Sequence, residues 1–70
     1  MTRLELVLEL HTSRRSLRTH RDRVLEELLA EVARVTGRSR GAIVALEART
    51  VRPPRARQPA RFRVVAWLVF

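Results

Sequence analysis

Apolar residues recur at spacings of three, four and seven between Ser13 and Thr36, which is the spacing of an amphipathic helix. The apolar stripe consists of Leu17, Val24, Leu25, Leu28, Leu29, Val32 and Val35. Thr12, Ser13 and Ser16 provide capping oxygens before the stripe, and a glycine at position 37 follows it as a C-terminal stop. The pattern predicts one continuous helix across this stretch.

Three other stretches alternate apolar and polar side chains with the period of a β-strand, at residues 2–11, 42–51 and 61–70. The inner face of the first strand is predicted to consist of Leu4, Leu6, Leu8 and Leu10. The second strand places on one face Ala42, Val44, Leu46 and Ala48, and on the other Ile43, Ala45, Glu47 and Arg49. The inner face of the third strand is predicted to consist of Phe62, Val64, Ala66, Leu68 and Phe70.

The elements follow one another as strand, helix, strand and strand, so the predicted fold class is α+β with β-α-β-β order. We expect a single domain over residues 1–70, with a three-stranded antiparallel sheet and one long helix packed on one of its faces. The last two strands are predicted to form a hairpin. Its connection, Arg52 to Ala60, contains all three prolines and is predicted to be an extended, exposed and basic loop.

The sheet face turned away from the helix is also apolar, although a solvated face should be polar. Its apolar residues are predicted to be Val7, Ile43, Ala45, Val65, Trp67 and Val69. A chain of 70 residues builds a small core, and without cysteine no disulfide reinforces it. The sequence therefore predicts that this face packs against another copy of the chain in a homo-oligomer.

The charge of the chain favours anionic partners. The formal net charge is +8, and all 15 basic residues are arginines. Such a balance attracts nucleic acid, phosphorylated ligands or anionic membrane surfaces. A GC-rich coding sequence or adaptation to heat produces the same composition, so charge alone does not select a function.

Several functions and locations are not indicated. The seven carboxylates are scattered, and no Gly-rich phosphate loop or nucleophile elbow is present, so no enzymatic activity is expected. His11 and His20 have no further ligands at metal spacing. Glu5 and Glu9 interrupt the first apolar stretch, and residues 64–70 are too few for a membrane span, so we expect a cytoplasmic protein.

Three segments carry a resemblance that covers nearly the whole chain: His11-Thr12-Ser13, Ile43-Val44-Ala45-Leu46-Glu47, and the alternation from Phe62 to Phe70. In these the sequence resembles the dodecins, small strand-helix-strand-strand proteins that assemble as hollow dodecamers and typically bind flavins. The chain departs from the family where members place a flavin-stacking Trp, since it has Gly41-Ala42 there, and where they place a flavin-contacting Gln, since it has Arg63. The resemblance implies the fold and the oligomer more directly than the flavin.

Trp67 and Arg63 lie two pleats apart on the outer face of the last strand, and Val65 and Ala45 share that face. An indole beside a guanidinium can stack a flat anionic ligand. Together with the resemblance, this makes a flavin (riboflavin, FMN or FAD) or another flat phosphorylated cofactor the leading candidate. The alternative is that Trp67 belongs to the core of an interface between copies.

Two groups of arginines are further candidates. Arg14, Arg15 and Arg18 crowd the predicted helix start, where the dipole and the unpaired N–H groups favour a phosphate; they alternatively pair with Glu5 or Glu9 from a neighbouring strand or subunit. The second group, either a track for a nucleic-acid backbone or part of a solvated loop, consists of Arg49, Arg52, Arg55, Arg57 and Arg61. The alternative functions are therefore nucleic-acid binding and a structural assembly module without a ligand.

Overall fold

The fold consists of a small sheet with its helices on one side. The computed structural model describes residues 1–69, so the predicted strand position Phe70 lies outside the described residues. The elements in chain order are β1 (Thr2–Leu10), α1 (Arg14–Thr19), α2 (Arg21–Thr36), the 3₁₀ turn η1 (Arg40–Ala42), β2 (Ile43–Arg52) and β3 (Ala60–Leu68). The predicted α+β class, with three strands and one main helix, is confirmed.

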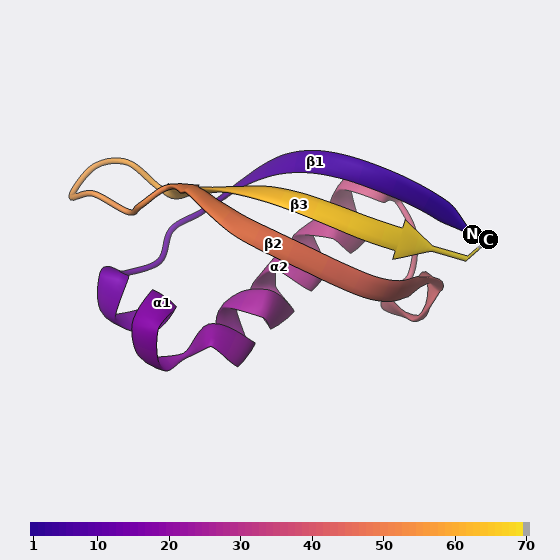
Figure 1. The fold of residues 1–70 in the computed structure, drawn as a ribbon, viewed down its shortest axis with the longest axis horizontal. Helices are drawn as coiled ribbons and strands as arrows, with labels where there is room; N and C mark the ends of the chain where they lie inside the picture. The colour runs from indigo at the N-terminus through magenta and orange to yellow at the C-terminus, as the bar shows by residue number, and fades with distance from the viewer. Residues whose placement is uncertain (70) are drawn as a thin grey trace.

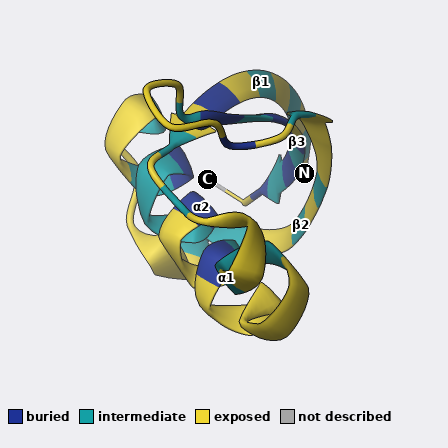
Figure 2. Cartoon of the chain, turned by 90° about the vertical axis from the view of Figure 1, so that its left-hand side faces the viewer, coloured by how far each residue is buried: buried dark blue, intermediate teal, exposed yellow. Residues whose placement is uncertain are grey.

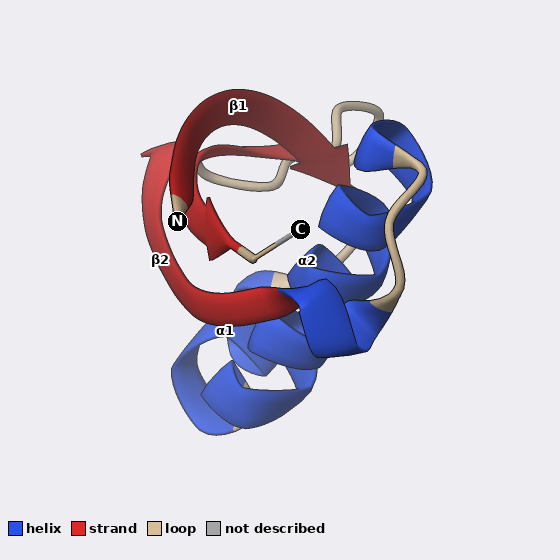
Figure 3. Cartoon of the chain, turned by 90° about the vertical axis from the view of Figure 1, so that its right-hand side faces the viewer, coloured by secondary structure: helices blue, strands red, loops and turns tan. Residues whose placement is uncertain are grey.

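The sheet is antiparallel, and its strand order is β1-β3-β2. The last strand of the chain is therefore central, and β2 and β3 form the predicted hairpin. The long helix α2 lies against one face, and the sheet curls partly around it (Figure 1, Figure 3). The outer face of the sheet is consequently convex, and no element of the described chain covers it.

The core lies between the sheet and α2, where the buried side chains gather (Figure 2). It consists of Leu8, Val24, Leu28, Val32, Ala60, Phe62, Val64, Ala66 and Leu68. Leu4, Leu6 and Leu10 pack against it as partly buried side chains. The inner faces predicted for the first and third strands are thus confirmed for the described residues, because burial follows the two-residue period of a strand.

The predicted single helix is wrong, because the helix breaks at His20. The backbone of His20 has φ −126° and ψ 46°, outside the helical region. Its N–H donates to the Ser16 carbonyl oxygen at 2.8 Å, which closes the last turn of α1. Only polar side chains lie between Leu17 and Val24, so no apolar contact holds the residues around His20 in line, and Leu17 is the apolar side chain through which α1 packs against the core. A helix this short depends on such packing for its position.

The predicted caps of the helical stretch are confirmed. Ser13 has extended backbone angles, and its Oγ accepts a hydrogen bond from the Ser16 N–H at 3.0 Å. Gly37 has φ 70°, and its N–H donates to the Ala33 carbonyl oxygen. A left-handed residue at this position ends a helix without the steric penalty that a Cβ atom would bring. Local side-chain chemistry therefore determined both outer ends of the helical stretch.

The alternation predicted for the second strand is wrong at its start. Ile43 lies opposite Leu68 and Ala45 lies opposite Trp67, so Val44 is an extra residue, a β-bulge. The bulge turns Ile43 inward, where it packs against the core, and leaves Val44 52% exposed. Ala42 belongs to η1 and not to the strand. The sequence had placed Ile43 on the outer face, and that prediction is therefore wrong.

The connection between β2 and β3 is less extended than predicted. β2 continues through a second bulge to Arg52, and Pro54 is buried. The backbones of Arg55 and Gln58 then exchange two hydrogen bonds of 3.1 and 3.2 Å, which close a tight turn at the tip. The hairpin loop is thus a folded protrusion with an exposed tip.

Candidate functional site

The outer face of the sheet is organised in rows of three residues, one from each strand. The rows, starting near the chain termini, are the aromatic row (Arg3, Trp67, Ala45), the acidic row (Glu5, Val65, Glu47), the basic row (Val7, Arg63, Arg49) and the hairpin row (Glu9, Arg61, Arg52). Successive rows are about 6.8 Å apart, because they are two residues apart along a strand. The four predicted cofactor residues Trp67, Ala45, Val65 and Arg63 occupy three successive rows.

The basic row brings two arginines together without a carboxylate partner. Arg63 lies directly opposite Arg49, and both side chains are exposed. Neither side chain makes a hydrogen bond or ion pair within the described residues. Like charges directly opposite one another destabilise a sheet, and an anion between them removes this repulsion. The basic row therefore has the electrostatics of an anion site.

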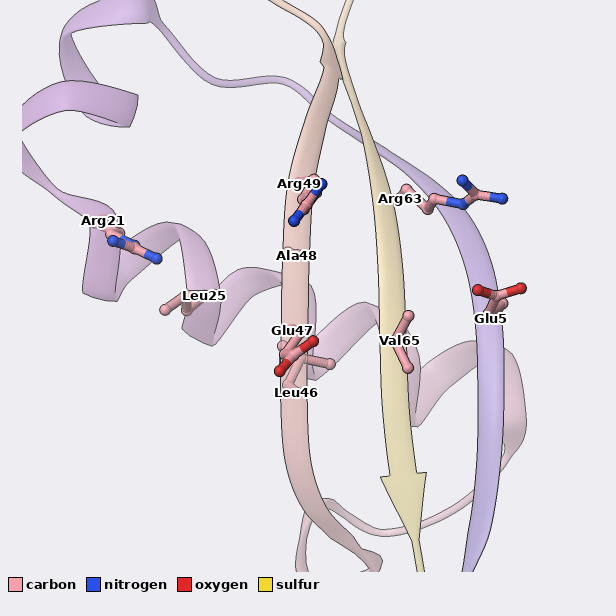
Figure 4. A pocket seen from close by; sticks show the side chains of 9 residues that line it. All are labelled: Glu5, Arg21, Leu25, Leu46, Glu47, Ala48, Arg49, Arg63 and Val65. Atoms are coloured by element: carbon pink, nitrogen blue, oxygen red, sulfur yellow. The ribbon is translucent and has the colours of Figure 1, made fainter.

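A shallow cavity of about 590 Å³ runs over this part of the face and around the edge of β2 (Figure 4). Its lining comprises Glu5, Arg21, Leu25, Leu46, Glu47, Ala48, Arg49, Arg63 and Val65. Arg21 comes from the first position of α2 and lies on the far side of β2 from Arg63 (Figure 4). The cavity thus combines three arginines, two carboxylates and an apolar surface.

Trp67 lies one row beyond this cavity. It is half-buried, with Arg3 on one side and Ala45 on the other. Four residues separate Trp67 from Arg63 along β3, which is about 13 Å. The acidic row lies between them, with Val65 flanked by Glu5 and Glu47.

Sequence reasoning did not include the two carboxylates in this site, and it assigned the second arginine, Arg49, to the nucleic-acid alternative. Glu5 and Arg49 reach Val65 and Arg63 only through strand pairing. The alternation in each strand shows which residues face outward, but it does not state which residues lie opposite one another. The placement of Glu47 and Arg49 on the outer face of the second strand was correctly predicted. The pairing of these two residues with β3 was not predicted.

The helix-start arginines and the tip of the hairpin loop, which carries Arg55 and Arg57, lie at one end of the molecule, whereas Arg49 of the second predicted group lies in the basic row. α1, which carries Arg14, Arg15 and Arg18, lies at the same end as the hairpin loop (Figure 1). A cleft of about 410 Å³ between them is lined in part by His11, Ser13, Arg23 and Arg55. No carboxylate pairs with Arg14, Arg15, Arg18, Arg55 or Arg57 in the described part of the chain. The expected pairing of the helix-start arginines with Glu5 or Glu9 is therefore absent within one chain.

Glu9 instead holds the two arginines of the hairpin row. Its Oε1 accepts hydrogen bonds from Arg61 Nη2 at 2.8 Å and from Arg61 Nε at 3.1 Å, and lies 3.5 Å from Arg52 Nη2. Arg52 Nη2 also donates to the Pro59 carbonyl oxygen at 3.1 Å. The hydrogen bond from Arg61, followed by the charges of both guanidinium groups, holds the pKa of Glu9 below its ordinary value. Arg52 and Arg61 therefore tie the ends of the hairpin to β1.

This lowered pKa predicts a pH dependence of stability. A carboxylate whose pKa is lower in the folded state stabilises the fold above its unfolded pKa, and this contribution is lost as the pH falls through the folded value. We expect wild type to lose more stability than Glu9→Gln between about pH 6 and about pH 3. The measurement is the urea midpoint of both proteins at each pH. Equal losses in the two proteins would show that Glu9 does not contribute to the acid sensitivity.

The described residues contain neither a metal-binding group nor a membrane-spanning helix. No three His, Asp or Glu side chains lie where they could hold a metal ion together. None of the helices in residues 1–69 has the length and apolar character needed to cross a membrane. Comparison with known proteins found no family model, no curated protein and no solved structure that matches this chain.

Proposed function

We propose that this protein is a self-associating, dodecin-like binder of a flat phosphorylated ligand, with a flavin nucleotide as the leading candidate. The observation that carries the proposal is the pair Arg49 and Arg63, opposed on an open face without a carboxylate partner. Guanidinium groups bind phosphate through two parallel charge-assisted hydrogen bonds, which neither water nor a neutral side chain replaces.

The order of the rows matches the order of groups in such a ligand. A phosphate on the basic row would place the next part of the molecule over the acidic row, where Glu5 and Glu47 accept hydrogen bonds from hydroxyl groups. The following row offers Trp67 for stacking against a flat ring. FMN has these three parts in this sequence: a phosphate, a chain of hydroxyl-bearing carbons and a ring system. Glu5 and Glu47 do not prevent an anionic ligand from binding, because its phosphate charge lies over the basic row, one row away from these carboxylates.

Self-association is the second part of the proposal. Val7 is 65% exposed and Val69 is 48% exposed, while Val65 and Trp67 are half-buried on the same face. A domain of this size gains stability by covering such a face. The described residues contain no disulfide and no metal group that could take that role.

The test is titration of the protein into FMN, measured by the quenching of flavin fluorescence. Riboflavin, which lacks the phosphate, should bind at least about tenfold more weakly than FMN, because charge-assisted hydrogen bonds contribute about 1.5–3 kcal/mol each. The double variant Arg49→Gln/Arg63→Gln should remove this preference. The matched control is Arg14→Gln/Arg15→Gln, which removes the same charge from exposed side chains of α1 without an ion pair. Equal binding of both flavins, or no binding of either, would contradict the proposal.

Nucleic-acid binding is the second candidate, favoured by the meeting of the α1 and hairpin-loop arginines at one end of the molecule (Figure 1). Affinity for an oligonucleotide should then fall steeply with salt. The same two double variants separate the candidates. Loss of oligonucleotide binding in Arg14→Gln/Arg15→Gln, with FMN binding unchanged, would assign the nucleic acid to the arginine-rich end.

A further inference from the structure

The rows of the outer face alternate in charge along the sheet. The acidic row carries two carboxylates, of which, within residues 1–69, Glu5 forms an ion pair of 3.2 Å with Arg3 of the aromatic row and Glu47 forms none. The adjacent basic row carries two guanidinium groups and no anion. The aromatic row contains one cation, Arg3, and the hairpin row contains Arg52 and Arg61 with Glu9. A surface of the same size with the opposite order of charges would complement this one. A second copy of this sheet, turned end to end, has its rows in reverse order and therefore presents that order of charges.

When two sheets pack face to face with their strands aligned, a two-fold axis between the two copies runs either along or across the strands. An axis along the strands places each row over the same row of the second copy, so Glu5 meets Glu47 and carboxylates face carboxylates. An axis across the strands reverses the order of the rows. When this axis passes between the acidic and basic rows, each acidic row lies over the basic row of the other copy. Of these arrangements only the last brings both charged rows onto opposite charges.

We propose that a second copy of this chain packs on the outer face of the sheet, with its strands antiparallel and its basic row over the acidic row. In this arrangement Glu47 faces Arg49 of the second copy, and Val65 lies over the stem of the second copy's Arg63. Arg3 faces Glu9 of the second copy. Trp67 meets Arg61 of the second copy, a pairing in which a guanidinium lies over an indole. Every contact occurs twice because of the symmetry.

The size and shape of the face indicate a weak and reversible dimer. Three strands of nine or ten residues present a surface of about 14 by 30 Å, or about 840 Å² when both copies are counted, which is below the roughly 1,200 Å² of a stable specific interface and in the range of transient ones. The face is also convex, because the sheet curls around α2 (Figure 2, Figure 3). Two convex faces touch first along β3, and the gap widens toward β1 and β2. Long side chains such as Glu47 and Arg49 on the outer strands are suited to bridge such a gap.

The dimer has a consequence for the ligand that rests on the proposed function. Glu47 of the second copy lies beside Arg49 and Val65 of the second copy lies over Arg63, so together they occupy the place where a phosphate would bind. Ligand and second copy therefore exclude each other on this face. FMN is expected to convert the dimer into monomers, and dilution is expected to raise the apparent affinity for FMN.

The experiment measures the dimer dissociation constant by sedimentation velocity, in the absence of ligand, for wild type and charge-reversed variants. Glu47→Arg alone and Arg49→Glu alone should each weaken the dimer at least about tenfold, since each places like charges opposite one another twice. The double variant Glu47→Arg/Arg49→Glu restores both pairs and should return to within about threefold of wild type. The control is Glu27→Arg, which makes the same charge change at an exposed position of α2. Far-UV circular dichroism establishes that every variant folds.

The outcomes separate the second copy from other occupants of the face. The proposal is overturned if the protein is a monomer at all concentrations, or if it forms a larger assembly that these charge changes do not affect. It is also overturned if Glu47→Arg strengthens the dimer, which would indicate a two-fold axis along the strands. Recovery of dimer formation in Glu47→Arg/Arg49→Glu supports the proposed dimer. Rescue without any effect of FMN on the dimer supports the interface and overturns the proposed ligand site. Rescue in the double variant, together with dissociation of the wild-type dimer by FMN, supports both.

Discussion

Replacing Leu28 by alanine is expected to remove about half of the free energy of unfolding. Leu28 has no exposed surface and lies on α2 in the centre of the core. Removing such a side chain costs about 2–5 kcal/mol, because apolar burial is lost and a cavity remains. A domain of this size has a total stability of about 4–10 kcal/mol, so one substitution removes a large part of it.

The matched control is Leu29→Ala, the same substitution at the next position of α2. Leu29 is half-buried and does not belong to the residues that pack against the core. We expect this variant to lose no more than about 1 kcal/mol. Urea unfolding followed by circular dichroism, at one fixed protein concentration, measures both losses and avoids a shift caused by self-association. Equal losses would show that α2 does not pack on the sheet through the stripe containing Leu28.

The strands and their inward faces were predictable because they depend on one local property, the period of apolar residues. Leu8 in β1 and Phe62, Val64 and Ala66 in β3 are buried as their two-residue spacing indicated. Tertiary packing reinforces this spacing, since a shift by one residue would expose the entire inner face of a strand. The predicted strands differ from the observed ones by only one or two residues at each end.

The break in the helix was less visible because no proline or glycine marks it. Leu17 and Val24 are seven residues apart, a spacing that is consistent with one continuous apolar stripe along a helix. The intervening residues are polar, so two turns lack any apolar contact with the sheet. The length of this polar interval is the sequence signal that favours a break, because α1 packs against the core near Leu17 while the polar residues before Val24 are not held in line with α2.

The candidate site was only partly predictable because its charges are assembled by pairing between strands. Trp67 and Arg63 lie on one strand, and their common face followed from alternation alone. Arg49 and Glu5 join them through the alignment of β2 and β1 with β3, which depends on the bulges and the hairpin loop. Those features place like charges opposite one another in the basic row. A sequence pattern within one strand contains no information on this arrangement.

The bulge in β2 leads to the second prediction with a large effect. Ile43 packs against the core, whereas Val44 is 52% exposed. Ile43→Asp is therefore expected to cost about 2–4 kcal/mol, because it removes apolar burial and places a carboxylate against the core. Val44→Asp should cost less than about 1 kcal/mol, since its side chain remains in water and only the strand preference of valine is lost.

The two variants form a matched pair, because the same charge is introduced at adjacent positions of one edge strand. Simple alternation without the bulge places Val44 inward and Ile43 outward, and it predicts the opposite order of stabilities. Urea midpoints of the two variants against wild type therefore measure the position of the bulge directly. A larger loss for Val44→Asp would place Val44 inward. It would then move Ile43 to the outer face, while Ala45, on the other side of the bulge, would stay opposite Trp67.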